Sequence, residues 1–359
     1  MNGNLQSNVV LPTTFLADPH IVAHSMPDLT DKLRRPVRDL RISVTDRCNF
    51  RCTYCMPKEI FGKDYEFLPR DDLLSPDEMV MVAETFVARG VEKVRITGGE
   101  PLLRKGIEDL IARLSVIDGL GDLTLTTNAS LLQRKAQGLA DAGLDRVTVS
   151  LDALDDATFE KMNDVGFPVH SVLEGIEAAA EVGLGPIKIN CVVQRGVNEH
   201  AVVEMANQFK GTGHIVRFIE YMDVGTTNGW RLDDVVTAEE MIQSINEIHP
   251  VEPVPPNYPG EVANRFRYLD GEGEVGVIAS VSKPFCGSCT RARVSAEGTL
   301  YTCLFASKGE DLRGAIRSGD DLGAIIDRVW SEREDRYSEA RSSQTVRIGT
   351  PVEMSYIGG

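Results

Sequence analysis

Three absences narrow what this 359-residue chain can be. No apolar run approaches the roughly 18 residues that a membrane-spanning helix needs. The N-terminus has no basic segment followed by an apolar core, so we predict no signal peptide and expect a cytoplasmic protein. Positive charge is scarce as well: the net charge is −16, which argues against nucleic acid and membranes as partners. An anionic small molecule could bind only in a pocket where Arg and Lys are concentrated.

The order of sequence patterns divides the chain into three parts. Hydrophobic residues make up 42% and charged residues 26%, as in an ordinary globular protein. Residues 1–35 are polar and lack periodicity, which predicts a flexible N-terminal arm. Residues 36–225 alternate between strand and helix patterns and predict a barrel domain. Residues 226–359 include a proline-rich stretch, short strand-like runs at 275–281 and 300–304 and a helix-like segment at 322–332, and predict a smaller α+β region that covers the mouth of the barrel.

Strand-like and helix-like segments alternate through the middle part. Strands are predicted at 40–45, 94–97, 123–127, 146–151, 187–193 and 215–220. Amphipathic helices are predicted between them at 76–89, 107–117, 131–142, 171–182 and 201–210. Strand–helix–strand units of this spacing form right-handed parallel crossovers. Six such units predict an α/β fold, namely a partial (β/α)6 TIM-like barrel.

Polar side chains recur at every second position of the predicted strands. Fully buried parallel strands are usually apolar throughout. Here five successive strands carry the alternating sets Arg41, Ser43 and Thr45; Arg95 and Thr97; Thr124 and Thr126; Thr148 and Ser150; Lys188 and Asn190. Residues that alternate along a strand share one face. The pattern predicts a barrel with a polar and partly cationic interior; an open sheet with one solvated face is the alternative.

Histidine is rare, and cysteine is clustered in a way that indicates metal binding. Six of the seven cysteines form two triplets, Cys48, Cys52 and Cys55, and Cys286, Cys289 and Cys303. In a reducing compartment such spacings are typical of metal ligands rather than disulfides. Structural zinc sites have four ligands, and no histidine lies near either triplet to complete one. Three thiolates suit a four-iron cluster with one open iron, which is predicted at the first triplet. The second triplet likewise leaves one coordination position open, and a zinc site is the alternative at each triplet.

Two arginines stand beside the second triplet. Arg291 and Arg293 alternate along a segment that is expected to be extended, so their guanidinium groups share one side. Such a pair suits recognition of phosphate oxygens. Two solvent-exposed arginines are the alternative.

The first triplet and the loop after the second predicted strand resemble a known superfamily. Cys48-x3-Cys52-x2-Cys55 follows a strand and includes an aromatic residue, Tyr54, and Gly98-Gly99-Glu100-Pro101 ends the next strand. Both are similar to the motifs of radical S-adenosylmethionine enzymes. The resemblance implies that the open iron of the first cluster binds S-adenosylmethionine. It also implies that the cofactor is contacted by Tyr54, Gly99, Ser150 and Met222.

Further motifs extend the resemblance over nearly the whole chain from about residue 33. The segments 39–48, 95–104, 218–225 and 289–293 and the final Gly358-Gly359 resemble those of the GTP 3′,8-cyclase family of molybdenum cofactor biosynthesis. The resemblance implies two 4Fe-4S clusters with three cysteine ligands each, the second of which is held by Cys286, Cys289 and Cys303 and binds the guanine of GTP at its open iron. It implies that GTP is contacted by Arg41, Arg95, Thr126, Lys188, Arg291 and Arg293.

The resemblance also implies a reaction. A 5′-deoxyadenosyl radical removes the hydrogen from ribose C3′ of GTP, and the C3′ radical attacks guanine C8; reduction and protonation give 3′,8-cyclo-7,8-dihydro-GTP. Arg291, Arg293, Gly358 and Gly359 are the implied catalytic residues, with the Gly-Gly tail reaching into the active site. Glycine permits a close approach of the backbone there, whereas a frayed terminus is the alternative.

Partners follow from the same resemblance. They are GTP, S-adenosylmethionine, an electron donor, the downstream cyclic pyranopterin monophosphate synthase and a second copy of the chain in a homodimer. Two rival interpretations stay open at this point. One is a radical enzyme with an auxiliary cluster that acts on a peptide, and the other is a non-catalytic metal-binding module.

Overall fold

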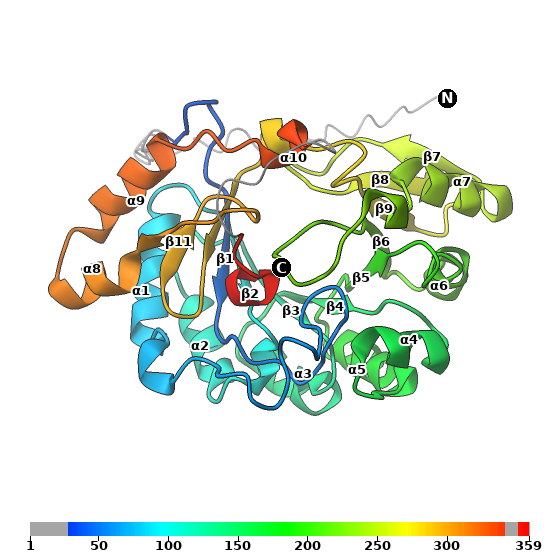
Figure 1. The fold of residues 1–359 in the computed structure, drawn as a ribbon, viewed down its shortest axis with the longest axis horizontal. Helices are drawn as coiled ribbons and strands as arrows, with labels where there is room; N and C mark the ends of the chain where they lie inside the picture. Colours follow the sequence, from blue (N-terminus) through cyan, green and yellow to red (C-terminus); the bar gives the residue numbers. More distant parts are fainter. Residues whose placement is uncertain (1–27, 342–350, 359) are drawn as a thin grey trace, which may run out of the picture.

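The computed structural model describes residues 28–341 and 351–358. In this part of the chain one twelve-stranded sheet runs in the order β12-β11-β10-β1-β2-β3-β4-β5-β6-β9-β8-β7. The sheet curls, with helices along its outer side and the C-terminal helix α11 (Met354–Ile357) near the centre (Figure 1). The prediction of an α/β partial barrel is therefore confirmed.

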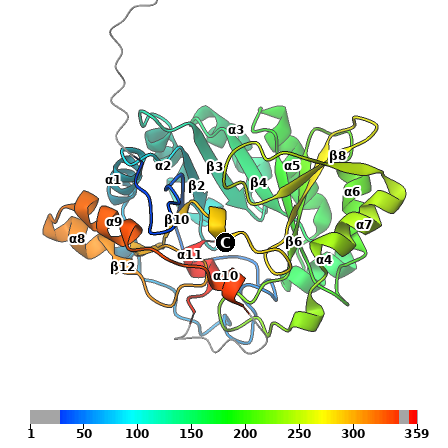
Figure 2. The same ribbon diagram turned by 90° about the horizontal axis from the view of Figure 1, so that it is seen from above.

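Six parallel strands and the helices between them make the barrel wall. The strands are β1 (Asp39–Ser43), β2 (Lys93–Thr97), β3 (Asp122–Thr127), β4 (Arg146–Ser150), β5 (Lys188–Val193) and β6 (Ile215–Glu220). The helices are α1 (Pro76–Val87), α2 (Ile107–Leu114), α3 (Leu132–Asp141), α4 (Asp156–Asn163), α5 (Val169–Glu181) and α6 (Ala201–Phe209). The view from above shows them outside the strands (Figure 2). Every predicted strand and helix of this part is present, and the prediction missed only α4.

Helix α1 shows how the local sequence sets an element and its packing. The Ser75 hydroxyl accepts a hydrogen bond from the Glu78 backbone N–H, the Glu78 carboxylate accepts one from the Ser75 backbone N–H, and Pro76 occupies the first helical position. Met79, Val82 and Phe86 recur at helical spacing and are fully buried. Burying side chains of this size contributes about 1.5–3 kcal/mol each, so this apolar face holds the helix on the sheet.

The strands alternate as predicted. Leu40, Ile42 and Ile96 have no exposed surface and belong to the hydrophobic core with the helices. Arg41 and Arg95 alternate with them and are neighbours in the β1–β2 register. Their side chains therefore project to the opposite, inner face of the sheet.

The C-terminal region extends the barrel sheet at both edges. Its strands are β7 (Val251–Val254), β8 (Asn264–Tyr268), β9 (Glu274–Ile278), β10 (Arg291–Val294), β11 (Thr299–Tyr301) and β12 (Glu310–Asp311). Strand β9 pairs in parallel with β6, and β10 pairs in parallel with β1. The segments predicted at 275–281 and 300–304 match β9 and β11, but the prediction missed β7, β8 and β12 and did not place β10 beside β1. That pairing sets Arg293 beside Arg41.

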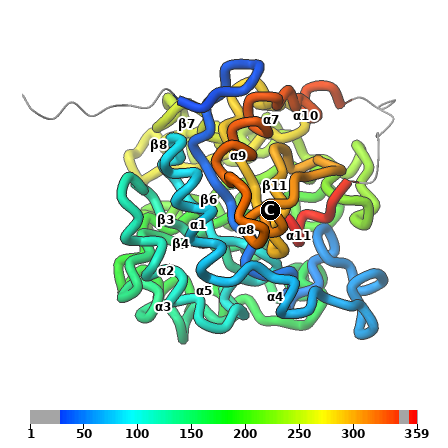
Figure 3. Tube along the Cα trace, turned by 90° about the vertical axis from the view of Figure 1, so that its left-hand side faces the viewer, coloured from blue at the N-terminus to red at the C-terminus, as the bar shows by residue number. Residues whose placement is uncertain are grey.

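The helices of the same region are α7 (Ala238–Ile248), α8 (Leu312–Ser318), α9 (Leu322–Ser331) and α10 (Tyr337–Ala340). The first three lie at the two sides of the barrel, and α10 lies between them near the second cysteine triplet (Figure 1). Figure 3 shows α8 and α9 on the side that α1 occupies, and α9 packs against α1. The helix expected near residues 322–332 is α9, whereas α7, α8 and α10 were not predicted. None of the helices in the described ranges is long and apolar enough to cross a membrane.

The predicted flexible arm, residues 1–35, falls mostly outside the described residues. Residues 28–35 of this arm are described, and among them Asp31 and Arg35 are buried. Arg35 donates to Asp31 at 2.6 Å and to the backbone oxygen of Cys286 at 2.6 Å, while Arg333 lies 3.3 Å from Asp31. The segment just before β1 is thus packed against the second cysteine triplet.

Candidate active site

One large pocket opens at the ends of the barrel strands and contains both cysteine triplets. Its lining includes most residues that the sequence singled out: Cys48, Cys52, Cys55, Cys286, Cys289, Cys303, Tyr54, Gly99, Ser150, Met222, Arg41, Arg95, Thr126, Arg291 and Arg293. Lys188 is not among the lining residues. Gly358 lies beside it, because its backbone oxygen accepts a hydrogen bond from Arg293. Gly359 lies outside the described residues.

The first triplet occupies the loop that leaves β1. The thiol of Cys48 accepts contacts from the backbone N–H of Phe50 at 3.4 Å and from Asn128 Nδ2 at 3.8 Å. Burial, followed by the nearby Glu100 carboxylate, raises the pKa of Cys48 to about 12, and burial also raises the pKa values of Cys52 and Cys55. Such thiols become thiolates when a metal centre supplies positive charge, so this desolvated loop suits metal ligation.

The Gly98-Gly99-Glu100 loop packs directly against the cysteine loop. Gly99 N–H donates to Thr45 O at 2.8 Å, and Glu100 N–H donates to Arg47 O at 2.8 Å. A Cβ atom on Gly98 would lie 2.5 Å from Thr45 O, and one on Gly99 would collide with Arg47 O. The two glycines are therefore required by close backbone approach, which is a structural reason beyond a tight turn.

Glu100 joins this loop to the end of β3. Its carboxylate accepts from Thr127 Oγ1 at 2.8 Å, Asn128 N–H at 2.7 Å and Leu102 N–H at 3.0 Å. Burial raises the pKa of Glu100 to about 7, against the opposing effect of these hydrogen bonds. The carboxylate thus positions Asn128, which in turn contacts Cys48.

Neither triplet is compact enough for a single ion. In a tetrahedral zinc site with Zn–S distances of about 2.3 Å, the sulfurs lie about 3.8 Å apart. Among the described residues the one set of three His, Cys, Asp or Glu ligand atoms within 4.8 Å of one another is Asp155, His200 and Glu204. Both cysteine triplets are therefore more open than a zinc site, as the larger iron–sulfur cluster requires. The donor sets fit 4Fe-4S clusters with three thiolates each.

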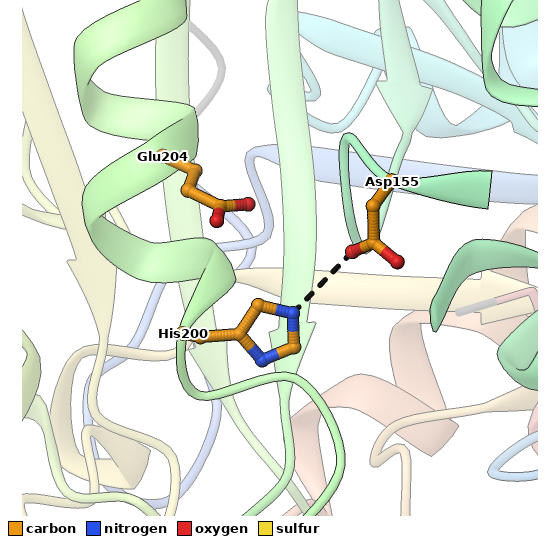
Figure 4. A group of neighbouring side chains, drawn as sticks. All are labelled: Asp155, His200 and Glu204. Carbon is orange, nitrogen blue, oxygen red and sulfur yellow. Dashed lines mark hydrogen bonds and ion pairs between the residues drawn. The ribbon is translucent and has the colours of Figure 1, made fainter. Parts of the chain in front are cut away.

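The Asp155–His200–Glu204 group lies away from the pocket and is exposed (Figure 4). Asp155 accepts the Thr158 backbone N–H at 2.8 Å as the N-cap of α4, and its other oxygen lies 3.3 Å from His200 Nε2. Glu204 follows His200 by one turn of α6. These contacts tie the start of α4 to the start of α6, so we assign the group a structural role.

The wall beside the first triplet is formed by the ends of β4 and β5. Tyr54 donates to Asp152 Oδ2 at 2.8 Å, and Val192 N–H donates to Asp152 Oδ1 at 2.9 Å. The carboxylate therefore ties the cysteine loop to two strands. Burial raises the pKa of Asp152 to about 6, although these hydrogen bonds oppose the rise. The sequence prediction missed Asp152, whose only signal was its position two residues after Ser150.

The second triplet lies in an electropositive setting. Arg291 Nη2 and Nε lie 3.1 and 3.3 Å from Cys289 Sγ, and Arg333 donates to the Cys289 backbone oxygen at 2.8 Å. Burial raises the pKa of Cys289, but the charges of Arg291 and Arg333 outweigh it and lower the pKa to about 6. Cys303, farther from these charges and nearer Asp335, has its pKa raised by burial to about 11. The two triplets thus differ in their electrostatic surroundings.

A group of buried arginines lines the space between the triplets. The pocket lining contains seven arginines and three aspartates, so its charge is positive in a protein of net charge −16. Burial and the neighbouring Arg293 and Arg95 lower the pKa of Arg41, and burial with Arg291 lowers that of Arg293 to about 10. Two buried nitrogens, Arg41 Nε and Arg95 Nε, have no hydrogen-bond partner. Crowded cations with unpaired donors favour an anionic ligand.

Strand register shows how these side chains meet. Arg293, Arg41 and Arg95 are consecutive neighbours across β10, β1 and β2. Arg95 donates to Thr126 and Thr148, each at 3.0 Å. Lys188 is the register neighbour of Thr148 and shares the inner face of β5 with Asn190, one layer nearer the strand start. It therefore lies beneath the pocket lining.

Arg217 is a further cation that the sequence prediction missed. It lies on β6, lines the pocket and donates twice to Asn190 Oδ1, at 2.7 and 3.0 Å. Burial and Arg95 lower its pKa to about 9. The same alternation that marked Arg41 and Arg95 extends to Arg217, so the signal was present in the sequence.

Comparisons with known proteins agree with this site. Residues 42–209 match the model of the Radical SAM superfamily. The crystal structure of Streptococcus suis SuiB bound to S-adenosylmethionine has a TM-score of 0.58 at 15% identity, covering 81% of this chain and 68% of that chain. That likeness shows the fold. Fold, cysteine loop and family model together define a radical S-adenosylmethionine protein.

A second family model and two relatives of similar length identify the family within this superfamily. Residues 214–339 match the model named Molybdenum Cofactor Synthesis C. A GTP 3′,8-cyclase of Acidothermus cellulolyticus is 53% identical over 358 residues, covering 92% of this chain and 99% of the relative. One of Xanthomonas campestris is 52% identical over 340 residues, covering 93% of this chain and all of the relative. The chain belongs to the GTP 3′,8-cyclase family.

Proposed function

We propose that this protein is a radical S-adenosylmethionine lyase that converts GTP to 3′,8-cyclo-7,8-dihydro-GTP, the first step of molybdenum cofactor biosynthesis. The observation that carries the proposal is a single pocket lined by both cysteine triplets and by seven arginines. A cofactor at one triplet and a nucleotide at the other would share one pocket. No observation favours a peptide substrate or a non-catalytic module.

The residues present have distinct proposed roles. Cys48, Cys52 and Cys55 hold the first cluster, and Tyr54, Gly99, Ser150 and Met222 surround S-adenosylmethionine. When bound, the cluster and S-adenosylmethionine supply a 5′-deoxyadenosyl radical, which takes the C3′ hydrogen of the substrate. Cys286, Cys289 and Cys303 hold the second cluster, beside which the guanine binds. The arginines and threonines of the lining would hold the sugar in a fixed position relative to the base.

The cationic residues are proposed to bind the triphosphate. Arg41 and Arg95 present buried Nε–H donors without a partner. Arg291 and Arg293 stand on the same face of β10, and Lys188 and Arg217 complete the cationic layer. Thr126 is held by Arg95 and faces the same space. A triphosphate would replace cation–cation repulsion with charge-assisted hydrogen bonds.

The direct test is an anaerobic turnover assay with the cluster-loaded protein, GTP, S-adenosylmethionine and dithionite. We expect 5′-deoxyadenosine, methionine and 3′,8-cyclo-7,8-dihydro-GTP, identified by mass spectrometry. GTP deuterated at C3′ should transfer deuterium to 5′-deoxyadenosine. Cleavage of S-adenosylmethionine without a cyclised nucleotide, or without transfer from C3′, would overturn the proposal.

The affinity for GTP should depend on pH through Lys188. Burial first, then the charges of Arg217 and Arg146, lower the pKa of Lys188 from 10.5 to about 7. A bound triphosphate raises that pKa again, so above pH 7 binding requires proton uptake. Affinity should therefore fall as the pH rises from 7 to 9, by up to about tenfold per unit. Titration calorimetry in two buffers of different ionisation enthalpy measures the uptake.

Lys188→Met should bind GTP more weakly at pH 7 and lose the dependence between pH 7 and 9. Lys210→Met is the control, because Lys210 pairs with Asp270 at 2.5 Å outside the pocket lining. An unchanged pH dependence in Lys188→Met would show that another group accepts the proton.

The glycine tail is proposed to contribute to catalysis, and Gly358 offers a test. Gly358 has a φ of +73°, and an added Cβ would collide with Thr97 Cγ2. Gly358→Ala should displace the tail and lower turnover by about 10–100-fold, since strain of about 1–3 kcal/mol falls on a short terminal segment. Adding one residue after Gly359 should likewise lower turnover.

The matched control is Gly183→Ala. Gly183 also has a positive φ, of +84°, but an added Cβ meets nothing within 4 Å. Gly183→Ala introduces backbone strain just after α5 but no steric collision, so its turnover should stay at the wild-type level. Iron content should be unchanged in both variants, and equal turnover in the two would contradict the role of the tail.

The proposal includes the partners and the oligomeric state that membership of the family suggests. An electron donor reduces the first cluster, and a cyclic pyranopterin monophosphate synthase consumes the product. We further propose a homodimer in the cytoplasm. The chain is proposed to divide into an arm (1–35), a radical S-adenosylmethionine barrel (36–225) and a C-terminal region with the second cluster and the tail (226–359).

A further inference from the structure

The carboxylate of Glu353 is held by a loop far away in the sequence. Thr226 donates to Glu353 Oε1 twice, from its backbone N–H and from its Oγ1, each at 2.9 Å, and Thr227 Oγ1 donates to Oε2 at 3.0 Å. Glu353 immediately precedes α11, yet its side chain does not cap that helix. Its carboxylate accepts hydrogen bonds from this loop instead.

The loop fits closely around this carboxylate. Gly225 has a φ of +64°, and a Cβ atom there would collide with Glu353 Oε2. Gly225, Thr226 and Thr227 therefore form a receptor, called here the carboxylate cradle, that any side chain at position 225 would fill. One backbone N–H and two hydroxyls thus supply three donors to a single carboxylate.

The cradle belongs to the same loop as Met222. Asn228 Nδ2 donates to the Met222 backbone oxygen at 2.9 Å, and Tyr221 donates to Asn228 O at 2.6 Å. Trp230 Nε1 donates to Tyr221 O at 2.8 Å. These bonds fold residues 221–230 back on themselves, so the position of the cradle and the position of Met222 depend on each other.

The other end of the contact is the C-terminal tail. Val352 N–H donates to Ala306 O at 3.1 Å, which joins the tail to the segment after Cys303. Met354 and Ser355 line the pocket, and Gly358 O accepts from Arg293. In Figure 1 the helix α11 (red) lies at the centre of the barrel mouth. Glu353 is thus the point at which the tail meets the loop of Met222.

We propose that Glu353 is a positioning residue that seats the glycine tail by binding the carboxylate cradle. Its three hydrogen bonds fix the direction in which α11 and Gly358 enter the pocket. Because the cradle and Met222 share one loop, seating of the tail and formation of the S-adenosylmethionine wall are coupled. The catalytic consequence of this assignment rests on the proposed function. The contact between Glu353 and the carboxylate cradle does not depend on that function.

Hydrogen exchange of the cluster-loaded protein tests the structural part. In Glu353→Ala the amides of Val352 and Tyr356, bonded to Ala306 O and Glu353 O, should exchange at least tenfold faster than in the wild type. Glu353→Gln keeps an oxygen for the two donors of Thr226 and should give an intermediate rate. Glu334→Gln is the control, since Glu334 makes an exposed ion pair with Lys32. Wild-type exchange rates in Glu353→Ala would overturn the proposal.

The combined variant Thr226→Val/Thr227→Val shows whether faster exchange in Glu353→Ala comes from loss of the contact with the cradle or from a general loss of stability. It removes both hydroxyl donors, so adding Glu353→Ala to it should speed exchange much less than Glu353→Ala does alone. Full additivity would show that Glu353 and the cradle act independently, and would also overturn the proposal.

The catalytic part of the proposal is tested by how closely cleavage of S-adenosylmethionine is coupled to formation of the cyclised nucleotide. Glu353→Ala should keep its iron content and still cleave S-adenosylmethionine when that cofactor is saturating, although its KM for S-adenosylmethionine should rise because the Met222 loop is loosened. The ratio of 5′-deoxyadenosine to cyclised nucleotide should rise at least tenfold. Glu353→Gln should restore the ratio in part. An unchanged ratio with faster exchange would refute the catalytic role of seating. If the wild type forms no cyclised nucleotide, the proposed function fails while the exchange result still decides the contact.

Discussion

Cys303→Ser will stop formation of the cyclised nucleotide while cleavage of S-adenosylmethionine continues, whereas Cys52→Ser will stop both. The two cysteines belong to different triplets that line the same pocket. Cys52 lies in the loop beside Gly99 and Tyr54, where the cofactor is proposed to bind. Cys303 lies beside Arg293, where the nucleotide is proposed to bind. The positions of the two triplets thus predict separate losses of the two half-reactions.

The iron content of anaerobically purified protein provides the physical measure. We expect about eight irons per wild-type chain and about four in each variant, because each serine removes one of only three ligands. Electron paramagnetic resonance of the reduced protein should lose a different signal in each variant. Cys191→Ser is the matched control: Cys191 is fully buried, contacts Asp152 O at 3.5 Å and belongs to neither triplet.

Two results would contradict this division. Continued cleavage of S-adenosylmethionine in Cys52→Ser would mean that the first triplet does not hold the reducing cluster. An iron content of about four in the wild type, unchanged in Cys303→Ser, would mean that the second triplet holds no iron–sulfur cluster.

The barrel could be predicted because its signals are local. Strands β1 to β5 show the two-residue alternation that separates a polar inside from an apolar outside, and the sequence displays it directly. Two missed helices also had local signals that went unused. Asp155 caps α4 through the Thr158 N–H, and Thr237 with Glu240 forms a capping box at the start of α7.

The C-terminal region was harder because its decisive contacts are long-range. Strand β10 is only four residues long and gains its place by pairing with β1, about 250 positions earlier. Nothing in Arg291–Val294 itself specifies that partner. The Glu353 contact with Thr226 is of the same kind, with 127 positions between the residues. Sequence motifs identified the chemical groups, but tertiary pairing decided which groups face one another.

Arg293→Ala should abolish most GTP binding and thereby test the arginine group most severely. Arg293 is 4% exposed, lies beside Arg41 in the sheet register and donates to Gly358 O. Removing one partner of a buried charge pair costs about 2–5 kcal/mol. We therefore expect the Kd for GTP to rise by about 30-fold or more, with a further loss in kcat because the tail loses its anchor.

The ligand-free protein should respond in the opposite sense. Burial and the charge of Arg291 lower the pKa of Arg293 to about 10, so its charge destabilises the empty pocket. Removing that charge relieves repulsion and offsets the lost packing, which should keep the free energy of unfolding within about 1 kcal/mol of the wild type. The rise in Tm that GTP produces in the wild type should disappear, because that rise measures binding.

A further variant and a control show whether GTP binding depends on the charge of Arg293 alone or also on the shape of its guanidinium group. Arg293→Lys keeps the charge but not the planar pair of donors, and should give an intermediate Kd. Arg265→Ala is the control on strand β8, where Arg265 pairs with Glu274 at 2.5 Å outside the pocket lining. If Arg293→Ala binds GTP as the wild type does, the buried arginines serve the fold rather than the nucleotide. A large loss in Arg293→Ala with near-normal binding in Arg293→Lys would instead show that charge alone binds the triphosphate.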